Sequence, residues 1–152
     1  MQIVLFEPEI PPNTGNIARL CAATNTELHL IKPLGFSLED RYLKRAGLDY
    51  WENVQLRVWN NFVEYLQNAG QDKRIVATSA RQGVYLHDFE FTAQDALLFG
   101  PETRGLPLEI MNTLEHHVRI PIWGKVRSLN LSTAAGIVLY QALYSAKLLP
   151  QL

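Results

Sequence analysis

The sequence has a single cysteine and lacks any long apolar run. With Cys21 alone, no internal disulfide can form, and a reducing cytoplasm is the expected compartment. We expect Cys21 to lie in the core, because a nucleophilic cysteine needs an accessible, electropositive setting. No stretch reaches the roughly 18 apolar residues of a membrane span, and MQIVLFEPEIPP has no basic segment before its apolar run. Neither a membrane partner nor a signal peptide is therefore expected.

Net charge is also nearly absent, at −1. Nucleic-acid-binding domains usually present a basic surface, so the balance argues against a general nucleic-acid binder. The positive charge that is present is clustered: Arg41, Lys44 and Arg45 have the i, i+3, i+4 spacing of one helical face. Lys125 and Arg127 share a later segment. Either a solvated face or a local binding patch explains these clusters.

Apolar runs alternate with helical patterns along the chain. The strand-like runs are residues 3–6, 27–31, 54–58, 74–78 and 96–100, and helical patterns cover 14–24, 37–46 and 61–68. This alternation predicts an α/β fold, with a mostly parallel sheet flanked by helices. A chain of 152 residues without a repeat, linker or low-complexity tract predicts a single domain over residues 1–152.

Polar residues are scarce in the last helical segment. From Ala134 to Leu149 only Gln141, Ser145 and Lys147 are polar. A surface helix keeps a polar face, whereas one that is apolar almost all round must be covered on most sides. In a short chain, a second subunit is the cover we favour, which predicts a homodimer. A central core helix is the alternative.

The common nucleotide and metal motifs are missing. A dinucleotide fingerprint needs GxGxxG after the first strand and an acid after the second, where this chain has Lys32. Gly100 and Gly105 have P-loop spacing, but Leu106 and Pro107 replace its lysine and hydroxyl residue. The four histidines lack zinc-ligand spacing, so no metal is expected. No Ser-His-Asp arrangement offers a base for acyl transfer.

Three loops carry more special residues than plain connections need. They lie within residues 6–24, 97–107 and 119–133, each beginning at an apolar strand. In parallel α/β sheets, ligands bind at the carboxyl ends of the strands. The loops offer amides, hydroxyls, a buried-looking acid at Glu102 and an arginine at Arg19. This inventory suits a polar, uncharged ligand held by main-chain groups better than a phosphate.

These stretches resemble the three motifs of the SpoU branch of the SPOUT methyltransferases. NTGNIARLCAAT corresponds to the first, LLFGPETRGLP to the second and RIPIWGKVRSLNLSTAAGIVLYQAL to the third. The opening VLFEPEIPPNTGNIARLCA, together with RAGLDYW at 45–51, is most similar to the single-domain TrmL (YibK) group. The resemblance implies S-adenosylmethionine as methyl donor, a deep C-terminal trefoil knot and a homodimer. It also implies 2'-O-methylation of the wobble ribose, cytidine 34 or 5-carboxymethylaminomethyluridine 34, in leucine tRNAs.

Carried over by motif, the resemblance assigns residues to the methyl donor. They are positions held largely through main-chain groups, namely Thr78, Gly100, Ile120, Ser128, Leu129 and Asn130. A glycine at 100 would let the backbone approach a flat adenosine without a Cβ in the way.

The resemblance also assigns the reacting centre, with Arg19 at its middle. The catalytic set is Arg19, Asn13, Glu102, Ser128 and Asn130. A guanidinium is effectively never deprotonated, so Arg19 is expected to bind substrate phosphate and stabilise the developing alkoxide. Asn13 is also a candidate helix cap, and Asn130 or Ser132 can cap the last helix.

Single-domain members of the family carry no appended RNA-binding module, so the resemblance implies that the catalytic dimer itself holds the tRNA. The expected contacts are basic, namely Arg41, Lys44, Arg45, Arg81, Arg104, Lys125 and Arg127. An exposed Trp123 would stack on a base, while Trp51 and Trp59 are expected in the core.

Three other functions stay open on the sequence. The first is an enzyme of the same fold that methylates ribosomal RNA or another tRNA position. The second is a noncatalytic RNA-binding dimer, against which the joint presence of the catalytic set argues. The third, a nicotinamide oxidoreductase, is weakened by the missing glycines and by Lys32.

Overall fold

A parallel β-sheet forms the middle of the molecule. The computed structural model describes residues 1–47 and 51–151, so residues 48–50 of the RAGLDYW stretch lie outside the described residues. The strands are β1 (Gln2–Phe6), β2 (Glu27–Ile31), β3 (Leu56–Trp59), β4 (Arg74–Thr78), β5 (Val84–Tyr85), β6 (Asp95–Phe99) and β7 (His116–Arg119). The helices are α1 (Pro11–Thr24), α2 (Arg41–Gly47), α3 (Phe62–Asn68), α4 (Leu108–Met111) and α5 (Leu131–Ser145), with 3-10 turns η1 (Trp51–Asn53) and η2 (Leu86–Asp88).

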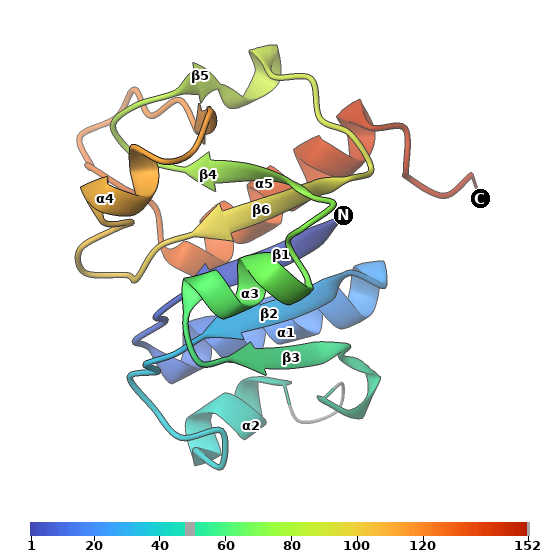
Figure 1. Cartoon of the computed structure of the whole chain (residues 1–152), viewed down its shortest axis with the longest axis vertical. Coiled ribbons are helices and arrows are strands. Elements are labelled where there is room, and N and C mark those ends of the chain that lie inside the picture. Colours follow the sequence, from blue (N-terminus) through green and yellow to red (C-terminus); the bar gives the residue numbers. More distant parts are fainter. Residues whose placement is uncertain (48–50, 152) are drawn as a thin grey trace.

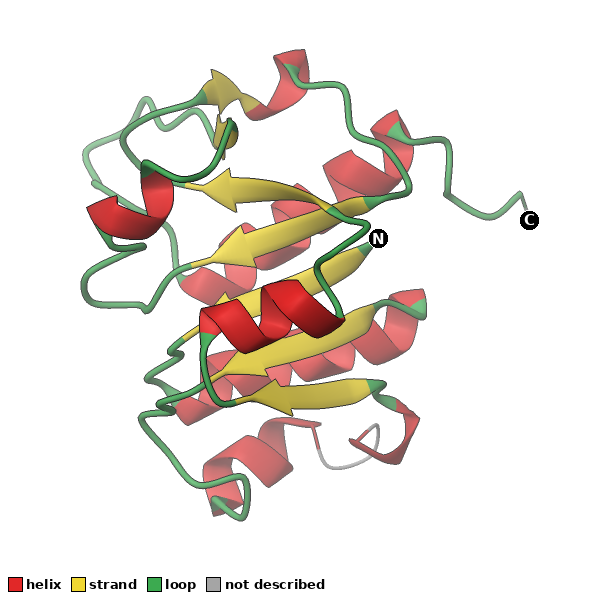
Figure 2. Cartoon of the chain, in the orientation of Figure 1, coloured by secondary structure: helices red, strands yellow, loops and turns green. Residues whose placement is uncertain are grey.

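The sheet confirms the predicted fold class. Within the described residues the strand order is β3-β2-β1-β6-β4-β7-β5, and each neighbouring pair is parallel (Figure 1). Helices α1 and α5 lie behind the sheet in Figure 2, and α3 lies in front of it. Because the strands are parallel, their carboxyl ends meet at one edge, where the arrowheads point in Figure 1.

Burial on both faces explains why the central strands read as continuous apolar runs. All residues of β1 and β6 are buried. Ile3 and Leu5 pack in the core cluster that includes α1 and α5, while Val4 and Phe6 pack with α3 on the other face. Cys21 is 1% exposed in the first cluster, and burial raises the pKa of its thiol to about 12. The thiol therefore stays protonated, as expected of a core cysteine.

Three helix boundaries differ from the sequence expectation. Helix α1 begins at Pro11 rather than at residue 14, because the fixed φ of proline suits a first helical turn. Helix α2 begins only at Arg41, where Asp40 Oδ1 accepts the Tyr42 N–H at 2.8 Å. Helix α5 ends at Ser145, since Lys147 takes a left-handed φ of 57°. None of the described helices is long and apolar enough to cross a membrane.

A late strand is inserted between two earlier ones. Strand β7 pairs with both β4 and β5, although β4 and β5 are joined by only the short segment 79–83. Gly83 in this segment has a φ of +115°, and a Cβ there would lie 2.6 Å from the His117 carbonyl carbon. The connection thus passes directly against β7. The trefoil knot stays a prediction, which this insertion supports.

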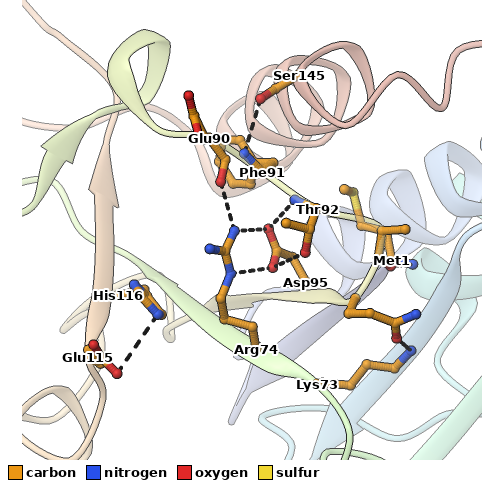
Figure 3. Close-up of polar contacts among 12 residues, drawn as sticks. Met1, Lys73, Arg74, Glu90, Phe91, Thr92, Asp95, Glu115, His116 and Ser145 are labelled. Atoms are coloured by element: carbon orange, nitrogen blue, oxygen red, sulfur yellow. Dashed lines mark hydrogen bonds and ion pairs between the residues drawn. The ribbon is translucent and has the colours of Figure 1, made fainter.

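An ion pair between buried Asp95 and partly exposed Arg74 holds together the opposite, amino-terminal edge of the sheet. Asp95 accepts hydrogen bonds from Arg74 Nε at 2.6 Å and Arg74 Nη2 at 2.8 Å, and from the Thr92 N–H at 2.8 Å (Figure 3). Nearby, Ser145 Oγ accepts the Phe91 N–H at 3.0 Å. We call Arg74, Thr92 and Asp95 the amino-edge network. Together with the Ser145 contact, it anchors the chain segment between β5 and β6 against the end of α5.

Candidate functional site

The three motif loops meet at the carboxyl edge of the sheet. Asn130, at the start of α5, donates from Nδ2 to Oδ1 of Asn13 in α1, at 3.0 Å. Glu102, which follows β6, accepts the Glu9 N–H at 2.7 Å through Oε2. The first motif loop and its helix therefore form hydrogen bonds with both the second and the third motif loops, as expected from parallel strands that end side by side.

Asn130 organises the start of α5 as well as the contact with α1. Its Oδ1 accepts the Ser132 N–H at 2.9 Å and the Ser132 O–H at 2.7 Å, so the cap prediction for Asn130 is confirmed. The cap prediction for Asn13 is wrong. Asn13 lies inside α1, whose N-cap is Ile10, and is only 5% exposed. The early start of the helix at Pro11 explains the difference.

The opening loop and the second motif loop form a second set of contacts. Glu9 Oε1 accepts both the Thr103 N–H at 3.0 Å and the Thr103 O–H at 2.8 Å. Arg104 forms an ion pair with Glu7. The hydrogen bonds from the backbone and then the side chain of Thr103 lower the pKa of Glu9. We call Glu7, Glu9, Glu102, Thr103 and Arg104 the acidic clasp.

Within the acidic clasp, only one of the two carboxylate oxygens of Glu102 has a hydrogen-bond partner among the described residues. Its Oε2 is taken by the Glu9 N–H, whereas Oε1 is buried and has no hydrogen-bond partner among the described residues. A buried acceptor without a donor is costly, and native structures rarely leave one unmatched. Glu102 Oε1 is therefore a candidate acceptor for a hydrogen bond from a bound ligand.

An apolar cavity of about 560 Å³ lies beside β7. Its walls include Leu86 of η2, Ile120 and Leu129 of the third loop, and Ile137 of α5. Of the residues expected at the methyl donor, Ile120 and Leu129 line this cavity, whereas Thr78, Gly100, Ser128 and Asn130 are not among its walls. A concave, mostly apolar site with a polar edge is the usual form of a small-molecule pocket.

Gly100 is required for a reason that the sequence did not reveal. A Cβ at this position would lie 2.3 Å from the Leu106 nitrogen and 2.5 Å from the Gly105 carbonyl carbon. Gly105 itself has a φ of +68° and donates its N–H to Pro101 at 2.9 Å. The absence of a Cβ at Gly100 therefore lets the second loop fold back on its own strand.

Arg19 is exposed on α1, away from the buried Asn13. An α-helix turns about 100° per residue, so these two side chains leave the helix about 120° apart. The side chains of Asn13 and Arg19 therefore lie on different sides of α1. Asn13 holds α5, and Arg19 is presented outward.

The basic residues expected at RNA are divided between the two ends of the sheet. Arg41, Lys44 and Arg45 lie on α2, beside the β3 end of the sheet, and Lys44 Nζ is 2.6 Å from Glu39 Oε2 (Figure 1). Arg81, Lys125 and Arg127 are exposed in loops toward the other end.

The tryptophans follow the sequence expectation. Trp123 is 90% exposed in the third loop. Trp59 is buried, and Trp51 packs against the core. An exposed indole in a loop is available for contact with another molecule, whereas the two packed indoles are not.

Sequence reasoning missed the partners of the second loop. Glu7, Glu9 and Thr103 are not among the expected site residues, although FEPEI is an unusually stiff and acidic loop. Leu86 and Ile137, which line the cavity, are missed too. Their only sequence signal is that each is apolar, which is shared with much of the core.

Fold and site together define an α/β enzyme whose ligand site is built from loops at the carboxyl edge of a parallel sheet. The SpoU rRNA methylase family model matches residues 1–140. The chain belongs to this family. It is an RNA 2'-O-methyltransferase that takes its methyl group from S-adenosylmethionine.

Individual relatives share both sequence and structure with the chain. It is 53% identical over 142 residues to a tRNA (cytidine(34)-2'-O)-methyltransferase of Methylovorus glucosotrophus, covering 92% of each sequence. A protein of the same name from Aeromonas hydrophila is 48% identical, covering 93% of this chain and 92% of the relative. A solved structure concerned with 2-OH methylation of C/U34 on tRNA has a TM-score of 0.92 and 46% identity, covering 96% of this chain and 95% of that one. The SpoU methyltransferase AviRb of Streptomyces viridochromogenes, in complex with AdoMet, has a TM-score of 0.81 and 26% identity, covering 95% of this chain and 59% of AviRb.

Proposed function

We propose that this chain methylates the ribose 2'-hydroxyl of the wobble nucleotide, position 34, in tRNA. Leucine tRNAs with cytidine or 5-carboxymethylaminomethyluridine at that position are the proposed substrates. The observation that carries the proposal is the meeting of the three motif loops beside an apolar cavity, through the Asn13–Asn130 and Glu9–Glu102 hydrogen bonds. Relatives at 53% and 48% identity, named for methylation of cytidine 34, support the choice of nucleotide.

The residues around the cavity fit S-adenosylmethionine. When bound, this donor supplies an electrophilic methyl group on a sulfonium sulfur. Ile120 and Leu129 offer apolar surface for a flat adenine ring. Thr78 and Gly100, at the ends of β4 and β6, and Ser128 and Asn130, just before α5, are proposed to add main-chain contacts.

In the proposed reaction, the ribose 2'-hydroxyl must lose its proton as it attacks the methyl carbon. We assign Arg19 to the neighbouring phosphate, where its fixed charge stabilises the developing alkoxide. Glu102 and Ser128 complete the polar surroundings, and Asn13 and Asn130 hold α1 and α5 together there. Arg19 cannot take the proton, because a guanidinium keeps its charge in proteins. The proton therefore passes to phosphate or water.

The proposed tRNA contacts are exposed or partly exposed cations. They are Arg41, Lys44 and Arg45 of α2, with Arg81, Lys125 and Arg127 of the loops. Arg104 is added to them: its guanidinium has five N–H donors, and the side chain stays 58% exposed while it pairs with Glu7. Trp123 is proposed to stack on a base.

We infer a homodimer from the uncovered face of α5. Tyr140 is 51% exposed and Tyr144 is 70% exposed, and Ile137, three residues before Tyr140 on the same helix face, is 41% exposed. An apolar helix face of this kind marks an interface. A second copy of the chain is the proposed cover.

Three further features belong to the same proposal. Residues 1–152 act as one domain, supported by a single sheet that takes strands from residue 2 to residue 119. The C-terminal half forms a trefoil knot, supported by the insertion of β7 between β4 and β5. The enzyme works in the cytoplasm, supported by the buried, unpaired Cys21.

The test is nucleoside mass spectrometry of tRNA from a strain that lacks this gene. We expect 2'-O-methylation at position 34 of leucine tRNAs to vanish and to return with the wild-type gene. Arg19→Ala should restore less than about one hundredth of the rate, because it removes a charge that acts on the transition state. Arg57→Ala is the matched control, since Arg57 is exposed on β3 and belongs neither to the proposed catalytic set nor to the proposed tRNA contacts, and it should restore methylation fully.

Other results separate the alternatives. Unchanged methylation at position 34 with a loss elsewhere in tRNA or ribosomal RNA would contradict the proposed nucleotide. Full complementation by Arg19→Ala would contradict the assigned mechanism. If S-adenosylhomocysteine does not raise the melting temperature of the purified protein, the donor site is contradicted as well.

A further inference from the structure

In the loop that follows β1, Glu9 both donates and accepts hydrogen bonds with the loop that follows β6. The Glu9 N–H donates to Glu102 Oε2 at 2.7 Å, and Glu9 Oε1 accepts the N–H and O–H of Thr103 at 3.0 and 2.8 Å. One residue of the first loop thus fixes two successive residues of the second. Glu7 adds a third tie through its ion pair with Arg104.

We propose that Glu9 is a positioning residue of the methyl-transfer site, acting through Glu102. This inference rests on the proposed function. Glu9 holds the 102–103 segment so that Glu102 Oε1 stays aimed at the bound substrate or donor. The Glu9 carboxylate accepts hydrogen bonds from Thr103, so in this proposal Glu9 does not itself contact the reacting atoms.

The sheet explains why residues 93 and 94 positions apart can meet. Strands β1 and β6 are parallel neighbours, with Leu5 paired to Phe99. Both loops therefore leave the sheet at the same height and side by side. Pro8 and Pro11 flank Glu9 and Ile10; each proline fixes its own φ, and Pro11 also restricts Ile10 before it, so the backbone on both sides of Glu9 is stiff.

The unmatched oxygen of Glu102 shows why this positioning matters. Glu102 Oε1 is buried and has no hydrogen-bond partner in residues 1–47 and 51–151. The two oxygens of a carboxylate are equivalent, so the position of this acceptor depends on where the 102–103 backbone lies and not on rotation of the group. The Thr103 contacts of Glu9 hold that backbone beside the Glu9 N–H.

The first arm of the test needs no catalysis. Hydrogen exchange of the Thr103 amide should speed up about tenfold in Glu9→Ala, because its acceptor is gone. Glu9→Gln keeps one carbonyl acceptor and should fall between Ala and wild type. Glu115→Gln is the control, because Glu115 is 89% exposed. In this variant the Thr103 amide should exchange at the wild-type rate. Unchanged exchange in Glu9→Ala would overturn the proposed contact.

The second arm measures single-turnover and steady-state rates on tRNA. Glu9→Ala should lower kcat at least tenfold with KM for tRNA and donor within twofold, and Glu9→Gln should recover part of the loss. Thr103→Val removes only the O–H donor and should lower kcat less than Glu9→Ala. In a Glu102→Gln background, Glu9→Ala should cost nothing more, because the two residues act as one unit.

The outcomes separate this inference from the proposed function. If wild type methylates position 34 and the Glu9 and Glu102 losses multiply, Glu9 does not act through Glu102 and this inference alone fails. It fails in the same way if Glu9→Ala raises KM while leaving kcat unchanged. If the wild-type protein is inactive on tRNA, the proposed function is contradicted. The proposed role of Glu9 in methyl transfer is then contradicted too, even if hydrogen exchange confirms the Glu9–Thr103 contact.

Discussion

Two charged clusters tie distant parts of this chain together, one at each edge of the sheet, and they differ in burial. In the amino-edge network the Asp95 side chain is 0% exposed and that of Arg74 is 32% exposed. In the acidic clasp Glu7 is 21% exposed and Arg104 is 58% exposed. Removing one partner of a buried pair leaves a costly unmatched charge, whereas solvent screens an exposed pair. The first cluster therefore stabilises the fold, and the second shapes the site.

Breaking the amino-edge network should give the largest effect. Asp95→Ala leaves Arg74 and the Thr92 N–H without their shared acceptor and should lower the free energy of unfolding by about 2–3 kcal/mol. Urea denaturation at one protein concentration measures the change. Asp72→Ala, at an exposed position, should cost less than about 1 kcal/mol. A loss in Asp95→Ala no larger than in this control would contradict the role of the network.

A buried histidine tests whether burial by itself makes a polar group matter for stability. His29 is 0% exposed; its Nδ1 accepts the Trp59 Nε1–H at 3.0 Å, and its Nε2 is 3.1 Å from Glu27 Oε2. Because indole only donates, Nδ1 carries no proton and His29 is neutral, with Nε2–H facing Glu27. Burial lowers the pKa of His29 below its usual 6.5.

The lowered pKa of His29 sets the sign of a pH effect. Below pH 6.5 the unfolded chain takes up a proton that the folded chain refuses, so stability should fall as the pH drops toward the folded-state pKa. The contribution is at most about 1.4 kcal/mol per pH unit. Urea midpoints at pH 7.5 and 5.5 measure it. His29→Asn should reduce the difference between the two urea midpoints, whereas His87→Gln, at an exposed position, should leave it unchanged. The same difference in wild type and both variants would rule out His29 as the cause.

The smallest effect on stability is expected in the acidic clasp. Glu7→Gln removes the charge that pairs with Arg104 and should change the free energy of unfolding by less than about 1 kcal/mol. Its effect should appear instead in kcat on tRNA, through a looser second loop. Equilibrium unfolding and steady-state rates on one preparation make the comparison. A destabilisation as large as that of Asp95→Ala would remove the distinction between the two clusters.

Parts of this molecule could be predicted because they depend on nearby residues. The strands at 3–6 and 74–78 lie within β1 and β4, since continuous apolar runs suit strands that are buried on both faces. Asn130 caps α5 because its side chain reaches amides two and three residues ahead. Motif similarity supplied the family, which local chemistry could not have supplied.

Other parts depend on contacts that no local pattern encodes. The sequence suggests a cap at Asn13, but this residue is buried against Asn130, 117 positions away in sequence. Gly100 is expected to make room for a ligand, which stays a prediction; the structure adds that it makes room for the backbone of Gly105 and Leu106. The partners of Glu9 follow from the pairing of β1 with β6, and strand order cannot be read from apolar runs.

The sequence by itself determined the α/β class, the apolar last helix and the identity of the three motif loops. Each of these depends on residue type and short spacing, which act within one or two turns of chain. Only the tertiary structure decided that β7 enters between β4 and β5, that the loops after β1 and β6 grip each other through Glu9, and that Glu102 Oε1 is left without a partner among the described residues. These contacts join residues that are far apart in sequence, so they exist only once the sheet has brought the strand ends together.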